Sequence, residues 1–193
     1  FFLKNDMEQA LLEYQKLLEI EQPVTNMSAR NVLSNYLISR GQLGLAAEQL
    51  QEGLELAEMV GEKSWVSGMH SGLSYVYALQ GRGEDAARAA DLAVGIARES
   101  GSQPNLQKAL FAQAMVLIQV DDLEEARRSA QELQQVISQG LNQRAMRHVY
   151  LLNGLLLNRA GRQTEALDEF KRSRELMPRI DESQAYLSDA MAE

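Results

Sequence analysis

Large apolar, small and polar residues recur along the chain with a period of 40 residues. Turn-forming residues mark the period at Gly41, Gly81, Asp121 and Gly161. A fixed period of this length predicts a solenoid, in which each repeat buries its apolar faces against its neighbours. Around each turn residue the pattern places a small residue seven positions before, a large apolar residue four before and an alanine five after: Ser34, Ser74, Ala114 and Gly154; Leu37, Tyr77, Leu117 and Leu157; Ala46, Ala86, Ala126 and Ala166.

Each period reads as two helices separated by a short turn. Ala, Leu, Gln and Glu are abundant and there are only three prolines, which favours helices over strands. Short connections make neighbouring helices antiparallel. The chain is therefore predicted to be all-α, an α-solenoid of antiparallel helix pairs, with helices over residues 25–40 and 43–60, 64–80 and 84–100, 105–120 and 123–139, and 143–160 and 164–177.

The small residues predict how the two helices of a pair meet. We expect Ala46 to face Ser34 and Ala166 to face Gly154, because two helices approach closely only where side chains are small. The large apolar residues are then expected to fill the space between successive pairs. Glycines after the second helices, at positions 61, 101 and 140, are expected to end those helices.

These patterns divide the chain into repeats over residues 25–62, 63–102, 103–140 and 141–178, all within one array over residues 1–193. Residues 1–22 read as the second helix of a preceding repeat, and residues 181–193 as a terminal capping helix or the first helix of a next repeat. Because uncapped array ends expose apolar surface, the chain is expected to be a fragment of a longer protein, and self-association through its ends is possible.

Composition narrows the function classes. The net charge of −8 argues against general nucleic-acid binding and against adhesion to an anionic membrane surface. No run of apolar residues is long enough to predict a membrane span. Cysteine is absent, which excludes disulfides and thiolate metal sites; the chain is expected in the cytoplasm, although a bacterial periplasm is also compatible.

The recurring small, large apolar and alanine positions resemble the tetratricopeptide repeat (TPR). The resemblance is strongest in the fourth repeat, where Gly154, Leu157, Ala166, Phe170 and Pro178 match the family motif. The resemblance covers residues 4–178 and implies a right-handed superhelix. It departs from the family in length, with 40 residues rather than the usual 34. The longer form looks like repeats of bacterial signalling and regulatory proteins.

No constellation in the sequence predicts chemistry. The two histidines, His70 and His148, fall in different repeats without acidic companions on their helices, whereas a metal site or a catalytic triad needs several converging groups. The sequence therefore predicts no enzyme, no metal and no cofactor.

Charge is distributed unequally between the helices of each pair. The first helices, over residues 27–40, 64–80, 103–119 and 141–160, contain no Asp or Glu. Their charged residues are all basic: Arg30, Arg40, Lys108, Arg144, Arg147 and Arg159. The TPR resemblance implies that first helices line the concave face, so we expect a neutral-to-basic groove. By the same resemblance, the ligand-contacting positions map onto Asn31, Asn35, Ile38, Ser71, Tyr75, Lys108, Phe111, Met115, His148, Leu151, Leu155, Asn158 and Arg159.

Two functions fit these expectations. The first is a non-catalytic protein–protein interaction scaffold whose groove binds a peptide or helix with apolar anchors and acidic residues. The second is a ligand-sensing, regulatory TPR domain of a bacterial signal-transduction or transcription regulator, in which a bound molecule shifts an equilibrium with an output domain. Neither requires a nucleic acid or a membrane.

Overall fold

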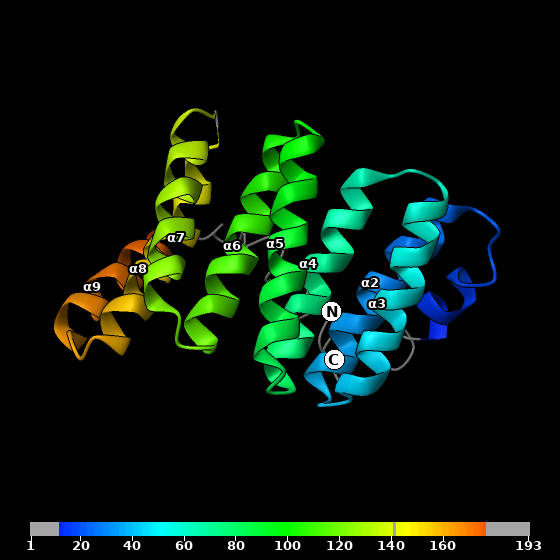
Figure 1. The fold of residues 1–193 in the computed structure, drawn as a ribbon, viewed down its shortest axis with the longest axis horizontal. Helices are drawn as coiled ribbons and strands as arrows, with labels where there is room; N and C mark the ends of the chain where they lie inside the picture. The colour runs from blue at the N-terminus through cyan, green and yellow to red at the C-terminus, as the bar shows by residue number, and fades with distance from the viewer. Residues whose placement is uncertain (1–11, 141, 177–193) are drawn as a thin grey trace, which may run out of the picture.

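The computed structural model describes residues 12–140 and 142–176, and every regular element in these residues is a helix, which confirms the predicted all-α class. The predicted segment 1–22 lies partly, and 181–193 wholly, outside the described residues. After helical residues 12–17 come α2 (Pro23–Ser39), α3 (Leu43–Met59), α4 (Lys63–Leu79), α5 (Gly83–Glu99), α6 (Gln103–Gln119), α7 (Leu123–Ser138), the 3-10 turn η1 (Gln143–Ala145), α8 (Met146–Arg159) and α9 (Gln163–Glu175) (Figure 1).

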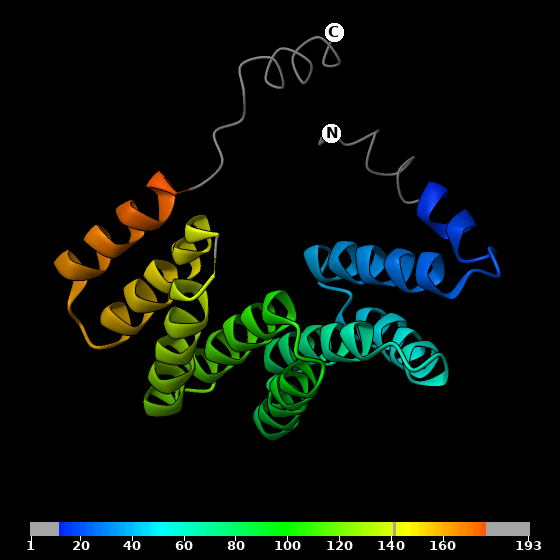
Figure 2. The same cartoon turned by 90° about the horizontal axis from the view of Figure 1, so that it is seen from above.

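Consecutive helices form antiparallel pairs: α2 with α3, α4 with α5, α6 with α7 and α8 with α9. The first helices of successive pairs pack against one another, whereas the backbones of the described second helices stay apart, and α5 reaches α7 through the Arg98–Glu132 ion pair. This unequal spacing bends the row of pairs into an arc (Figure 2). The first helices α2, α4, α6 and α8 therefore form the inner, concave wall, and the second helices form the convex side.

The turns within the pairs share one geometry. Gly41, Gly81, Asp121 and Gly161 all adopt a left-handed backbone, with φ of 72°, 74°, 66° and 75°. In each case the following residue donates its N–H to the carbonyl five positions back, as Arg82 does to Tyr77 at 2.9 Å. This pattern is the Schellman motif, which satisfies helix-end carbonyls and needs a left-handed residue. The predicted turn positions are therefore confirmed.

The small residues of the repeat are buried at every occurrence. Ala46, Ala86 and Ala126 are fully buried, and Ser34, Ser74 and Ala114 are at most 1% exposed. The core is divided into clusters of neighbouring helices, one around Leu50 and Met69 and another around Leu133 and Leu152. None of the helices in the described part of the chain has the length and apolar character needed to cross a membrane.

The fourth repeat differs in detail from the sequence expectation. Its first helix does not begin directly at Gln143, because η1 precedes α8. Gly140 does not adopt the left-handed backbone that Gly61 and Gly101 adopt, since the chain leaves α7 towards η1 instead. The nearest side chain to Gly154 is the ring of Phe170, one helical turn beyond Ala166; a Cβ at position 154 would lie 2.4 Å from its Cε1.

Candidate functional site: the concave groove

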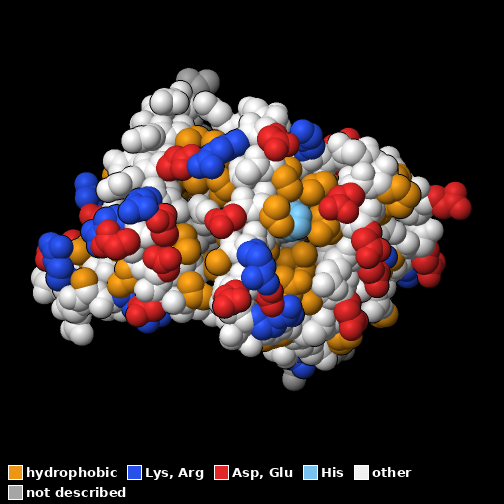
Figure 3. All heavy atoms as spheres, viewed as in Figure 1, with side chains coloured by type: hydrophobic (Ala, Val, Ile, Leu, Met, Phe, Trp, Pro, Cys, Tyr) orange, Lys and Arg blue, Asp and Glu red, His pale blue; other side chains and the backbone are white. Residues whose placement is uncertain are grey.

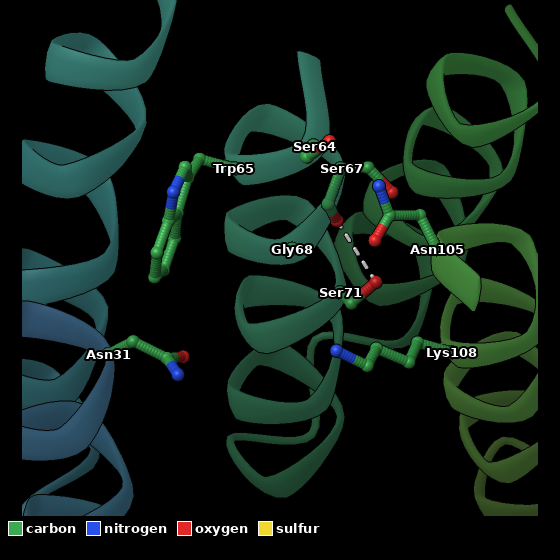
Figure 4. Close-up of a pocket in the computed structure, with 8 residues that line it drawn as sticks. All are labelled: Asn31, Ser64, Trp65, Ser67, Gly68, Ser71, Asn105 and Lys108. Carbon is green, nitrogen blue, oxygen red and sulfur yellow. Dashed lines mark hydrogen bonds between the residues drawn. The ribbon is translucent and has the colours of Figure 1, made fainter. Parts of the chain in front are cut away.

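The middle of the concave wall holds a pocket of about 400 Å³ along α4 (Figure 4). Its floor consists of small residues of α4, since Ser64, Ser67, Gly68 and Ser71 recur at helical spacing on one face. Trp65 points from α4 towards α2, and Asn31, Asn105 and Lys108 complete the walls from α2 and α6. We call this the α4 pocket.

The floor of the α4 pocket is open down to the backbone. A Cβ at Gly68 would meet no atom within 4 Å. The Ser71 hydroxyl donates to the Ser67 carbonyl at 3.0 Å, and the Ser67 hydroxyl donates across to the Ala93 carbonyl of α5 at 2.9 Å. Because these hydroxyl protons are engaged, the floor offers a ligand a close approach and oxygen acceptors, while the donors come from Lys108 and the amides of the walls.

A second pocket, of about 650 Å³, lies between α6 and the start of α8. It shares Lys108 with the α4 pocket, so the two form one concave groove running across four repeats. Its apolar surface is a pair of rings, Phe111 and His148, whose centroids are 4.7 Å apart at 39°. The remaining lining residues of this α6–α8 pocket are Pro104, Gln107, Asn142, Arg144, Ala145 and Arg147.

The surroundings of His148 favour the neutral form of its imidazole. Burial is the main cause that lowers its pKa, and the adjacent positive charge of Arg147 lowers it further. The Arg147 Nε donates to His148 Nε2 at 3.2 Å, which places a lone pair on that nitrogen. The ring therefore presents an uncharged, half-buried face beside Phe111, suited to an apolar or aromatic group of a ligand.

The groove carries positive charge without compensating carboxylates. Lys108, Arg144 and Arg147 line it, and no Asp or Glu lines either pocket. Within residues 12–140 and 142–176, none of these three cations forms a salt bridge, whereas Arg30, also on the concave wall, is bonded to Glu52. On the convex face, acidic and basic side chains are interspersed (Figure 3). The groove thus favours an anionic ligand on an otherwise acidic molecule.

The structure brings together five of the residues proposed from sequence. Asn31 and Ser71 line the α4 pocket, Phe111 and His148 line the α6–α8 pocket, and Lys108 lines both.

The other proposed residues lie outside the two pockets. The Asn35 amide donates to the Asn31 carbonyl at 2.9 Å, so that donor serves its own helix. The Arg159 guanidinium, at the end of α8, lies 3.9 Å from the carboxylate of Asp121 in the turn between α6 and α7. Ile38, Met115 and Leu155 are half-buried against the core clusters. Of the rest, Tyr75 and Asn158 are exposed, and Leu151 is half-buried.

The sequence analysis did not select several lining residues. Trp65 and Asn105 were absent from it, and Arg144 and Arg147 entered only through their charge. Two signals were available: the spacing of Ser64, Gly68 and Ser71, which predicts a stripe of small residues on α4, and the two arginines on either side of the start of α8, Arg144 and Arg147. Each of these four lining residues lies at or near the start of the first helix of its repeat, away from the intra-pair turn.

No group of three or more His, Asp or Glu side chains in the described residues is arranged to hold a metal ion. His70 lies on α4, away from the groove lining, and burial lowers its pKa while Glu58 partly opposes that shift. The groove therefore consists of a small-residue floor, an aromatic surface and a set of cations, which is the composition of a binding surface.

The chain matches no protein-family model and no curated protein sequence. Solved structures do resemble it. BtubC (BKLC) from P. vanneervenii superposes with a TM-score of 0.69 at 19% identity, covering 91% of this chain and 73% of that one. A Podosopora anserina protein with nearly identical TPR-like repeats gives 0.58 at 14% identity, covering 88% and 82%. The fold is a TPR-like solenoid. The apo form of RapI has the same TPR-like arrangement, with a TM-score of 0.63 at 15% identity and coverage of 89% and 74%.

These identities are low, so the neighbours establish the TPR-like fold and the helical-repeat scaffold, but not a shared ligand. The suspected resemblance from sequence is confirmed at the level of fold.

Proposed function

We propose that this chain is a non-catalytic protein-interaction module whose concave groove binds a peptide or helix carrying acidic residues and an apolar anchor. The observation that carries the proposal is the set of Lys108, Arg144 and Arg147 around the Phe111–His148 ring pair, with no carboxylate in either pocket. Charged partners of opposite sign are steered to such a surface, and apolar groups then bury against the rings.

The length of the groove supports a peptide rather than a single side chain as ligand. It extends from Asn31 on α2 through α4 and α6 to His148 on α8, with Lys108 at its centre. The small floor of the α4 pocket allows a ligand backbone to approach α4, where Asn31 and Asn105 offer amides for hydrogen bonds.

A direct test is the affinity of the chain for a synthetic fluorescent peptide of alternating Glu and Leu, measured by anisotropy. We expect Lys108→Glu to weaken binding roughly tenfold, which corresponds to about 1.4 kcal/mol. Arg128→Glu is the matched control, because Arg128 is exposed on α7 and does not line the groove. Equal affinities for all three proteins, or equal binding of a Lys–Leu peptide, would contradict the proposal.

The second candidate, a small-molecule sensor, is favoured by the size and ring pair of the α6–α8 pocket. Its volume of about 650 Å³ lies within the usual range of small-ligand sites. A screen of anionic aromatic compounds by thermal shift discriminates the two, since a sensor is stabilised by a compound and an interaction module by the acidic peptide.

A further inference from the structure

The α6–α8 pocket lies at the end of the array from which the chain leaves α9. Because α8 and α9 are antiparallel, the end of α9 lies beside the start of α8. The Ser173 hydroxyl of α9 donates to the Arg147 carbonyl of α8 at 2.8 Å, which fixes this proximity. Arg147 itself lines the pocket, so the width of α8 separates the last described turn of α9, on the convex side, from the groove.

The segment that follows α9 has the composition that the groove selects. Residues 181–193 contain Asp181, Glu182, Asp189 and Glu193, and no Lys or Arg. Tyr186 and Leu187 lie between the acidic residues and provide an aromatic and an aliphatic anchor. This acidic segment lies outside the described residues.

We propose that the acidic segment 181–193 docks in the concave groove of its own chain. The inference rests on the proposed function, since it assigns an occupant to the same groove. The carboxylates of the segment pair with Lys108, Arg144 and Arg147, and Tyr186 packs on the Phe111–His148 rings.

The connection is long enough for this docking. Residues 177–181 span roughly 17 Å when fully extended. Tethering also raises the effective concentration of the segment at the groove to the millimolar range, so a weak intrinsic affinity suffices for substantial occupancy. An external acidic partner then has to displace the segment, which makes the docking an intramolecular competitor of binding.

Placing the segment elsewhere is less favourable by charge. The second helices on the convex side carry many carboxylates; on α7, Glu125 and Glu132 are paired with Arg128 and Arg98, and Glu124 forms no salt bridge within the described residues. The groove is lined by three cations that form no salt bridge within residues 12–140 and 142–176. An acidic segment is therefore repelled less, and attracted more, at the groove than at the α7 surface.

The absence of cysteine allows site-specific labelling in the 193-residue chain. A nitroxide attached to a single cysteine, Ser188→Cys, broadens the amide signals of nearby residues in an isotope-labelled sample. We expect loss of the Phe111, Arg147 and His148 signals and recovery of these signals when Asp181, Glu182 and Asp189 are changed to Lys. A matched control label goes on Ser39→Cys, at the exposed end of α2 in the first helix pair, away from the α6–α8 pocket.

Three outcomes overturn the inference. Unbroadened groove signals exclude docking. Broadening confined to α9 places the segment as a cap on the last helix pair. Broadening in an equal mixture of nitroxide-labelled and isotope-labelled chains assigns the groove to a second copy. If the groove signals stay sharp while the Glu–Leu peptide still binds, only the intramolecular docking fails; if the peptide also fails to bind, the proposed function fails with it.

Discussion

At the scale of single residues, packing depends on positions where a side chain is absent. Gly154 lies against the ring of Phe170, and Gly72 lies against Leu50, whose Cδ2 would be 2.8 Å from an added Cβ. These glycines allow a helix to approach a large side chain of its neighbour. Gly95, in contrast, has no atom within 4 Å of the place where a Cβ would lie.

We expect Gly154→Ala to destabilise the protein by about 1–3 kcal/mol, because Phe170 must shift to admit the methyl group. Gly95→Ala is the control, and it should stabilise α5 by roughly 0.5–1 kcal/mol through the higher helix propensity of alanine. Urea unfolding of the three proteins measures both effects. A Gly154→Ala protein as stable as the parent would show that this contact is loose.

Burial of His148 makes stability depend on pH. Its folded-state pKa lies below the ordinary value of 6.5, so the unfolded chain binds the proton more readily than the folded chain. The stabilisation that comes from burying the neutral His148 ring is complete above pH 6.5 and is lost as the pH falls towards the folded-state pKa. The unfolding free energy should therefore drop over this window.

The His148→Gln variant should show a smaller drop over the same window, measured by denaturant titration at several pH values. His70 follows the same sign, since burial outweighs Glu58 in lowering its pKa, and the double variant should be flatter still. An unchanged pH profile in His148→Gln would indicate that this ring titrates as in water.

At the scale of helices, the intra-pair turns hold the repeat together. Four of them place a left-handed residue after the first helix, and in three this residue is glycine. Asp121 is the exception, with φ of 66°. A side chain disfavours this backbone, although aspartate tolerates it better than most residues. The stacking of Arg82 on Tyr77, with Cζ 4.2 Å from the ring centroid, adds a contact across one such turn.

Asp121→Gly is expected to raise the unfolding free energy by roughly 0.5–1 kcal/mol, because it removes the left-handed penalty. The loss of the 3.9 Å contact with Arg159 offsets little, since both side chains are largely exposed. Gly81→Val at the equivalent turn should instead lower the unfolding free energy. Thermal unfolding compares the pair, and a destabilised Asp121→Gly protein would refute the strain argument.

At the scale of the whole molecule, the core is a series of local clusters rather than one centre. The cluster around Leu50 and Met69 involves the first helix pairs, and the cluster around Leu133 and Leu152 involves the later ones. In a solenoid, each repeat contacts only its neighbours, so stability is a sum of local terms.

Leu152→Ala, at a fully buried site, should cost about 2–5 kcal/mol and should increase amide hydrogen exchange mainly in α6, α7 and α8, whose residues share its cluster. Leu50→Ala should instead increase exchange in α2, α3 and α4. Amide hydrogen exchange, measured by mass spectrometry on the peptides of each variant, tests both expectations. Uniform loss of protection along the array in either protein would contradict the local-cluster description.

The period, the helices and the turns were determined by the sequence, because these features depend on interactions within about ten residues. The predicted helix 64–80 is Lys63–Leu79, and the predicted turn residues adopt the left-handed backbone. The φ preferences of the turn residues and the burial of the recurring alanine and serine positions determine these features locally.

The groove was decided by the tertiary structure. Lys108, Arg144 and His148 meet only because α6 and α8 pack side by side on the concave wall, while Asn35 and Arg159, on the same set of helices, engage Asn31 and Asp121 instead. The periodicity of the sequence predicts which helices face inward. It does not predict at which point along each helix the walls of the groove come together. That depends on the angles between pairs, which follow from the packing of side chains of different repeats, such as Leu50 of α3 on Gly72 of α4.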